Sequence, residues 1–240
     1  MNQSTSVIKA SVRAGCDWLR SPPFAVDSPR SDPAMVPIRA LGENDRAAIA
    51  AHLRALDPHD RYLRFGLAMR DEQLQTYVEG IDFGRDDVFG IFNRHLRLVA
   101  MAHLARAADA EMLACAEFGV SVDATYRGRG YGDLLFARAI THARNHGVQL
   151  LFIHALSENA AMLHMARKAG ALLEREGSET EAYLRLPPAT IDTQVSEMLE
   201  EQVGRTDYLL KAQAKAFWDF LRTVQEIRRG VQDGRHRASP

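Results

Sequence analysis

The most informative stretch of this chain is Arg127-Gly128-Arg129-Gly130-Tyr131-Gly132, which lies between an apolar strand-like run, 116–122, and an amphipathic helix-like run, 133–146. Three glycines within five residues let the backbone approach a ligand closely and adopt conformations that a Cβ would forbid. Amides at the start of a helix favour an anion, because that helix end carries partial positive charge. The stretch therefore predicts a pyrophosphate-binding loop, with an ordinary solvated glycine turn as the alternative.

Two common nucleotide-binding motifs do not fit this loop. A dinucleotide fingerprint requires a third glycine three residues after Gly130, where Asp133 stands, and an acidic ribose partner, which is not evident. A P-loop requires Gly-Lys-Ser/Thr, which the chain lacks. The loop therefore belongs to neither of these two nucleotide-binding motifs.

The composition argues against several classes of function. The 240 residues carry 30 basic and 31 acidic side chains, a net charge of −1, which argues against a nucleic-acid or membrane-surface partner. Only two cysteines occur, Cys16 and Cys115, so we expect no disulfide framework and a reducing, cytoplasmic location. The first twenty residues lack the apolar core of a signal peptide, and we expect a soluble protein that is not exported.

Composition and periodicity divide the chain into four predicted regions. Residues 1–34, with several Ser-Pro and Asp-Pro pairs, are predicted to form a mobile leader. Residues 35–188 are predicted to fold as one domain. Residues 189–231 have the pattern of a C-terminal helical extension, and residues 232–240 are predicted to be disordered.

The domain pattern predicts an antiparallel meander followed by one parallel crossover. The expected strands are 36–41, 87–93, 96–105, 112–122, 148–153, 171–175 and 181–186. The expected helices are 43–56, a helix that begins after Asp57 with Pro58 in its first turn, 71–80, 133–146 and 157–170. We therefore expect a mixed, mostly antiparallel α/β (α+β) sheet with parallel central strands, flanked by helices.

The C-terminal segment carries an apolar stripe at largely i, i+3, i+4 spacing. Its members are Leu210, Phe217, Phe220, Leu221, Val224 and Ile227. Such a stripe must be covered, either by its own domain or by a partner chain, which would make a homodimer. Both alternatives are open at this point.

The loop motif Arg127-x-x-Gly130-x-Gly132 resembles the R/Q-x-x-G-x-G/A acyl-CoA motif of the GNAT superfamily of N-acetyltransferases. The order of predicted elements from Val36 to Leu186 resembles the whole GNAT fold, and the segment from Asn159 to Gly170 is similar to a second family motif. The resemblance implies fourth and fifth strands that splay apart and admit the pantetheine arm of acetyl-CoA.

The resemblance also implies the residues that hold this co-substrate. The backbone of Val120, Ser121 and Val122 would pair with pantetheine, and Asn159 would hydrogen-bond the same arm. The pyrophosphate would be cradled by Arg127, Gly128, Arg129, Gly130, Tyr131 and Gly132.

One position departs from the commonest pattern of the family. Ala166 stands where many members carry the tyrosine that protonates the departing thiolate. A thiol has a pKa of about 8.5, so its thiolate is a tolerable leaving group without a strong acid. Bacterial Pat-type protein-lysine acetyltransferases also lack that tyrosine, and residues 60–65, 116–118 and 162–170 resemble short stretches of them.

Acetyl transfer to an amine requires a base, because an amine with a pKa of about 10.4 is protonated at neutral pH. Glu117 is the candidate, and strand alternation places it on the face of Gly119 and Ser121. We expect this carboxylate to be enclosed, where desolvation makes a carboxylate a better base. A structural ion pair with Arg61 or Arg64 is the alternative.

No metal site is predicted. His142 and His146 share a helix face at i, i+4, but the glutamate of the zinc-protease motif is missing between them. We interpret both as solvated surface histidines.

The chain is therefore predicted to be an acetyl-CoA-dependent N-acetyltransferase that acetylates a primary amine by direct attack, with a protein lysine favoured narrowly over a small amine. A small-amine enzyme is one alternative, and a non-catalytic acyl-CoA-binding regulatory protein, consistent with Ala166, is another. A tRNA-acetylating toxin is a weaker one, because surfaces that track phosphates are usually basic.

Overall fold

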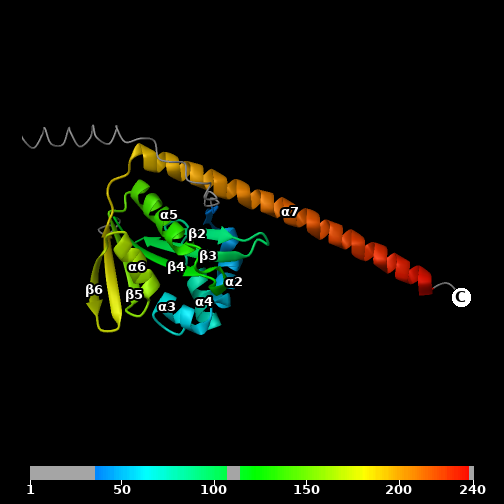
Figure 1. Cartoon of the computed structure of the whole chain (residues 1–240), viewed down its shortest axis with the longest axis horizontal. Coiled ribbons are helices and arrows are strands. Elements are labelled where there is room, and N and C mark those ends of the chain that lie inside the picture. The colour runs from blue at the N-terminus through cyan, green and yellow to red at the C-terminus, as the bar shows by residue number, and fades with distance from the viewer. Residues whose placement is uncertain (1–35, 107–113, 238–240) are drawn as a thin grey trace, which may run out of the picture. The chain divides into compact units, whose positions relative to one another are not determined.

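The computed structural model describes residues 36–106 and 114–237, with side chains up to residue 217 and at residue 219. The predicted leader, 1–34, lies outside the described residues, as does Cys16. Seven strands form one mixed sheet in the order β1-β2-β3-β4-β5-β7-β6, flanked by helices (Figure 1). Only β4 and β5 are parallel among the described strand pairs. The predicted fold class is confirmed.

The elements agree with the predicted order. The strands are β1 (Arg39–Leu41), β2 (Asp87–Phe92), β3 (Leu98–Arg106), β4 (Cys115–Val122), β5 (Leu150–Leu156), β6 (Leu172–Glu176) and β7 (Glu179–Arg185). The helices are η1 (Glu43–Asp45), α2 (Arg46–Ala55), α3 (Pro58–Phe65), α4 (Asp71–Glu79), η3 (Ala124–Tyr126), α5 (Tyr131–Asn145), α6 (Ala160–Lys168) and α7 (Ile191–Arg237).

Two helix starts follow from local sequence. The carboxylate of Asp57 accepts a hydrogen bond of 2.9 Å from the Asp60 amide, and Pro58 occupies the first turn, as predicted for α3. Helix α5 begins at Tyr131, two residues earlier than predicted, directly after Gly130. The loop thus leads straight into the first turn of α5.

The core lies on both faces of the sheet. On one face α5 packs against β4, where the rings of Phe118 and Phe136 lie 4.8 Å apart between centroids. On the other face α2 and α4 enclose a cluster that includes the fully buried Ile49, Leu53 and Leu74. Burial of such side chains contributes about 1.5–3 kcal/mol each, which holds both helix layers to the sheet.

The pairing of β4 changes halfway along the strand. Its first three residues, Cys115 to Glu117, pair in parallel with β5, whereas pairing with β3 continues to Val122. Along the described strands, β4 and β5 therefore separate after Glu117. This register is the predicted splay of the parallel central strands.

Helix α7 differs from the prediction at its C-terminal end. It continues to Arg237, although residues 232–240 were expected to be disordered. These residues include a glycine. Glycine in a helix interior costs about 1 kcal/mol relative to alanine, which weakens a helix but does not by itself end it. The limits of the four predicted regions stay predictions.

The N-terminal half of α7 packs on α5 and β1. Gly204 permits the approach to β1, because a Cβ there would overlap the carbonyl of Ile38. Leu210 is 62% exposed, so packing of the apolar stripe on its own domain is wrong for this residue. No helix in the described part of the chain is long and apolar enough to cross a membrane.

Candidate active site

A cavity of about 440 Å³ lies beside the glycine loop; we call it the loop cleft. Its walls come from the loop, the splayed end of β4, α3 and α6. The lining residues include Leu63, Arg64, Val120, Ser121, Val122, Arg127, Gly128, Gly130, Tyr131, Gly132, Asn159 and Met162. All the residues predicted to bind the co-substrate line this cavity except Arg129.

The glycines give the cleft an open backbone wall. Gly128 and Gly130 adopt φ values of +72° and +75°, which L side chains rarely adopt. At these two positions and at Gly132, no heavy atom lies within 4 Å of where a Cβ would be. The backbone is therefore accessible to a ligand next to the first turn of α5, where an anion is favoured.

The side chain of Ser121 is engaged on the sheet face away from the loop. Its hydroxyl lies 2.9 Å from Nε2 of His52, whose Nδ1 lies 3.2 Å from the carbonyl of Leu98. Burial lowers the pKa of His52 to about 4, so the ring is neutral, donates from Nδ1 and accepts at Nε2. The hydroxyl proton of Ser121 is thus engaged by His52.

The two loop arginines have different surroundings. Arg127 forms an ion pair with Asp60 in the first turn of α3, and the hydrogen bond to that carboxylate raises the pKa of the guanidinium. Arg129 lies 4.9 Å from the ring centroid of Tyr126, outside the lining of the cleft. Of these two arginines, Arg127 is the one that lines the cleft.

Asn159 has protein partners on both sides of its amide. Its oxygen accepts a hydrogen bond of 3.2 Å from the Met162 amide and caps α6, while its nitrogen donates to the carbonyl of Leu63 at 3.3 Å. The residue lines the cleft and joins α6 to the end of α3.

A second cavity, of about 290 Å³, adjoins the first; we call it the Glu117 pocket. The two cavities share the lining residues Leu63, Arg64 and Met162. The pocket is further lined by Tyr77, His103, Ala105, Glu117, Phe118, Gly119, His154 and Thr180. These three residues therefore lie between the two neighbouring cavities.

The comparisons with known proteins agree with this geometry. The sequence pattern of the Acetyltransferase (GNAT) family matches residues 50–171. The chain belongs to this family. It is a GNAT N-acetyltransferase, and the family takes acetyl-CoA as co-substrate.

Solved structures show the same fold. The GNAT domain of S. lividans PAT is 18% identical, with a TM-score of 0.54 over 62% of this chain and 89% of that one. An acetyltransferase of the GNAT family from Streptococcus pneumoniae is 15% identical, with a TM-score of 0.51 over 62% of this chain and 98% of that one. A search of curated protein sequences finds no match.

The residues of the loop cleft fit acetyl-CoA as this family uses it. The splayed end of β4 presents backbone to the cleft, which suits the amides of a pantetheine arm. The glycine loop leaves room for a pyrophosphate at the start of α5. The donor set thus combines backbone amides with the basic side chains of Arg64 and Arg127.

Glu117 differs from its prediction. The carboxylate was expected to be enclosed, but the residue is exposed, because the strands diverge after it and open this position to solvent. The alternative ion pairs have other partners, since Arg61 lies 2.7 Å from Asp71 and Arg64 donates to Tyr77 at 3.2 Å. Glu117 thus stands at the point where a GNAT sheet opens, with its side chain reaching solvent.

The sequence reasoning missed a polar chain at the Glu117 pocket. The hydroxyl of Tyr77 lies 2.6 Å from Nδ1 of His103, and Nε2 of that ring lies 3.4 Å from Asp86. His103 is a lone ionisable residue among apolar neighbours in β3 between Leu98 and Ala105. A buried histidine in such a strand was the available signal.

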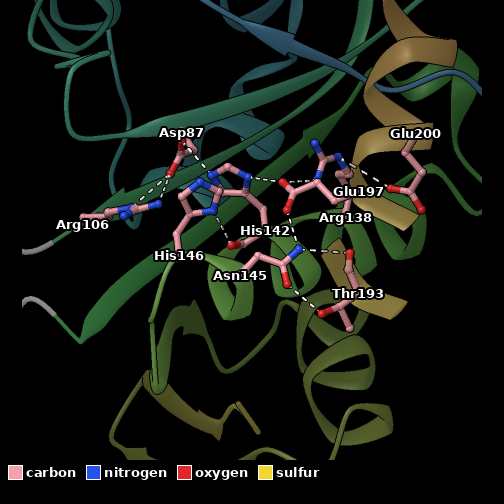
Figure 2. A network of polar contacts seen from close by, with 9 residues as sticks. All are labelled: Asp87, Arg106, Arg138, His142, Asn145, His146, Thr193, Glu197 and Glu200. Carbon is pink, nitrogen blue, oxygen red and sulfur yellow. Dashed lines mark hydrogen bonds and ion pairs between the residues drawn. The ribbon is translucent and has the colours of Figure 1, made fainter. Parts of the chain in front are cut away.

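His142 is also different from its prediction as a solvated histidine (Figure 2). Its Nδ1 bonds the carboxylate of Glu197 on α7, and its Nε2 lies 2.9 Å from Asp87 on β2. Burial disfavours the imidazolium, but these two carboxylates outweigh it and raise the pKa of His142. The ring therefore links α5 to Asp87 on β2 and to Glu197 on α7.

The same contacts explain a cluster with ligand-like spacing. Donor atoms of His142, His146 and Glu197 lie within 4.8 Å of one another. However, Arg138 pairs with Glu197 at 2.7 Å, and Asn145 donates to its other oxygen (Figure 2). The cluster is a network of ion pairs and hydrogen bonds that holds α7 to α5.

Proposed function

We propose that this GNAT enzyme transfers acetyl from acetyl-CoA directly to a primary amine, with a protein lysine as the favoured acceptor. The observation that carries the proposal is the junction of the two cavities at Leu63, Arg64 and Met162. A co-substrate in the cleft and an amine in the pocket would meet there. Such proximity replaces an encounter in solution and needs no covalent enzyme intermediate.

Different segments of the chain would bind different parts of acetyl-CoA. Bound acetyl-CoA supplies the acetyl group as a thioester. The backbone of Val120, Ser121 and Val122 would hold the pantetheine arm, and Asn159 would keep α6 beside it. The pyrophosphate would lie on the loop amides, with charge supplied by the first turn of α5 and by Arg127.

Glu117 would accept a proton from the entering ammonium group and expose its lone pair. Its carboxylate lines the pocket on the same strand that carries the cleft residues Val120 to Val122. A backbone amide of β4 near Val120 would stabilise the negative charge that develops on the carbonyl oxygen. Ala166 supplies no acid, so the thiolate would leave unassisted at that position.

The exposure of the pocket favours a lysine on a protein surface. Glu117 is exposed, and His154 and Glu181 beside the pocket are about half exposed, at 54% and 45% of their side-chain surface. A lysine side chain is long and flexible, so its amine can enter a pocket that opens to solvent. A small amine that enters the same pocket is the competing acceptor.

Transfer of labelled acetyl from acetyl-CoA into a cell lysate tests the proposal. Wild type is compared with Glu117→Gln and with the control Glu174→Gln, which changes an exposed glutamate on β6. We expect label on protein that Glu117→Gln reduces by about 10²-fold and Glu174→Gln leaves unchanged. Glu117-dependent label confined to small molecules would overturn the lysine assignment, and equal label with all three proteins would overturn the role of Glu117.

We also propose that α7 forms a homodimer. Leu210 is 62% exposed, and the sequence continues apolar at Phe217 and Val224, the seven-residue spacing of a helix that packs on a like helix. Leu210→Lys should shift the mass measured by light scattering towards the monomer. Leu67→Lys, at an exposed leucine outside α7, should not. A monomeric wild type would overturn the proposal.

The proposed reaction takes place in the cytoplasm. It uses a carboxylate and backbone amides, so it requires no metal ion. The free thiol of Cys115 supports a reducing compartment, and the net charge of −1 supports protein or small-molecule partners over nucleic acid or membrane. Dialysis against a chelator should leave the rate of acetyl transfer unchanged. A rate that falls and recovers with one added metal would contradict this.

A further inference from the structure

The conversion of an ammonium group into an amide removes two protons from the same nitrogen. One must leave before the nitrogen attacks, and the second must leave as the amide forms. Glu117 accounts for one of them under the proposed function, on which the present inference rests. The second proton can go to the leaving thiolate, to solvent or to a further group of the protein, and ionisable side chains beside Glu117 are candidates for that group.

The Glu117 pocket is also lined by two other ionisable side chains, those of His103 and Tyr77. His103 on β3 pairs with Gly119 on β4, and Ala105 pairs with Glu117, so His103 and Glu117 lie on the same sheet face two positions apart. Such diagonal neighbours have backbones about 7–8 Å apart. Tyr77 of α4 covers His103 from above this face, and both side chains line the pocket.

Hydrogen-bond directions follow from the protonation states. Burial, assisted by the charge of Arg64, lowers the pKa of His103, so its ring is neutral at neutral pH. Hydrogen bonds and charges outweigh the burial of Asp86 and lower the pKa of its carboxyl, so it is ionised. The ring therefore carries its proton on Nε2, towards Asp86, and Nδ1 accepts from the hydroxyl of Tyr77.

Tyr77 is held in a fixed position by three groups. Its hydroxyl donates to His103 at 2.6 Å and accepts from the guanidinium of Arg64 at 3.2 Å, and its ring packs edge-on against Phe65. Arg64 in turn lies over Gly119, where a Cβ would overlap its guanidinium. One lone-pair direction of the hydroxyl is left for a ligand in the pocket, because a phenol oxygen has two.

We propose that Tyr77 is a second catalytic residue, which takes one of the two amine protons and passes its own to His103. An N–H bond of the acceptor breaks as an O–H bond forms on Tyr77, and the original O–H proton moves to Nδ1 of His103. The imidazolium that results is stabilised by Asp86 and returns its proton to solvent after turnover. Glu117 takes the other proton, the new C–N bond replaces the thioester C–S bond, and the thiolate leaves with the electron pair of that bond. His103 and Asp86 are positioning residues in this scheme.

The pH dependence of the relay is set by the charges around His103. These are Arg64 on α3, Tyr77 on α4, Asp86 and Asp87 at the start of β2, and Glu117 on β4. Protonation of His103 would fill the acceptor position at Nδ1 and stop the relay. We therefore expect protonation of His103 to contribute to the fall of kcat/KM at acid pH.

The test compares Tyr77→Phe, His103→Asn and Glu117→Gln, with the control His95→Asn at an exposed turn. Asparagine at 103 can still accept a hydrogen bond from Tyr77 through its amide oxygen, but it cannot take up a proton. The measured quantities are kcat and KM for an amine acceptor, the pH profile of kcat/KM, the dissociation constant for acetyl-CoA and the melting temperature.

We expect Tyr77→Phe and His103→Asn each to lower kcat by about 10²-fold with acetyl-CoA binding unchanged. The contribution of His103 should disappear from the acid limb of kcat/KM in His103→Asn, whereas His95→Asn should match wild type. A wild-type kcat and an unchanged acid limb in His103→Asn, with Glu117→Gln inactive, would overturn the relay alone. Full activity in Glu117→Gln would instead contradict the proposed function.

Discussion

The guanidinium of Arg127 in the glycine loop forms an ion pair with the carboxylate of Asp60 in the first turn of α3. Both residues line the loop cleft, where the pyrophosphate of acetyl-CoA is proposed to bind. The carboxylate therefore competes with a phosphate for the same cation and adds a negative charge to the cleft. The pair joins the loop to α3 at some cost in affinity for an anion.

Asp60→Asn should bind acetyl-CoA more tightly. Removal of the carboxylate releases Arg127 and lowers the repulsion of phosphate, and an ion pair of this partly exposed kind is worth about 0–1 kcal/mol. We expect a dissociation constant several-fold lower by calorimetry, with a weaker advantage at high salt. Asp71→Asn, which removes the partner of Arg61 outside the cleft, is the control. Weaker binding in Asp60→Asn would show that the carboxylate supports the loop.

Gly130→Ala should weaken acetyl-CoA binding by more than its effect on folding. The residue adopts φ +75°, so alanine strains the backbone by about 1 kcal/mol, and its Cβ would enter the space beside the cleft. Gly177 in the β6–β7 turn has φ +60° and similarly open space, so Gly177→Ala carries a similar strain away from the cleft. We expect a similar loss of stability in both variants, but a tenfold or larger loss of affinity in Gly130→Ala alone.

The stability of the protein should pass through a maximum at mildly acid pH, because His142 links Asp87 and Glu197. The raised pKa of His142 means that its contribution is complete below the ordinary value of 6.5 and is lost as pH rises through the folded value. The bonds from His142 and Arg138 outweigh burial and lower the pKa of Glu197. Its contribution is complete above its ordinary value of 4.5 and is lost as pH falls through the folded value.

His142→Gln should remove the alkaline part of this dependence. We expect a loss of about 1–2 kcal/mol in the free energy of unfolding at pH 6, measured by urea denaturation, that becomes smaller as pH rises above 7. His146→Gln, which changes the exposed ring stacked on His142, is the control for a histidine outside the ion pairs. A constant difference between wild type and His142→Gln across pH 5–9 would mean that packing, not charge, is lost.

Gly204→Ala should separate α7 from β1. The added Cβ would overlap the backbone carbonyl of Ile38, which cannot move as a flexible side chain can. The contacts of Tyr208 with Arg39 and Phe92 lie one turn further along α7 and should weaken with it. We expect a fall of about 1–3 kcal/mol in stability, although alanine is the better helix former. A more stable variant would show that this contact is dispensable. Gly42→Ala, at an open position with a negative φ, should have little effect.

Local sequence predicted the order of the helices and strands and the position of the glycine loop. Asp57 with Pro58 specifies the start of α3. The apolar strands before and after the helix predicted at 133–146 indicate the parallel crossover. Caps and periodicity can be recognised in sequence because they act over a few residues. The glycines of the loop determine where a ligand can approach the backbone. The residues predicted to bind the co-substrate therefore line one cavity, except Arg129.

The surroundings of single polar residues depended on contacts between distant segments. The exposure of Glu117 results from the divergence of β4 and β5, and the partners of His103 and His142 come from α4, β2 and α7. Sequence periodicity indicates which face a side chain occupies, but burial and hydrogen bonding depend on what packs on that face. The sequence by itself thus determined the fold, the glycine loop and the candidate base, whereas only the tertiary structure decided which groups share the pocket with that base.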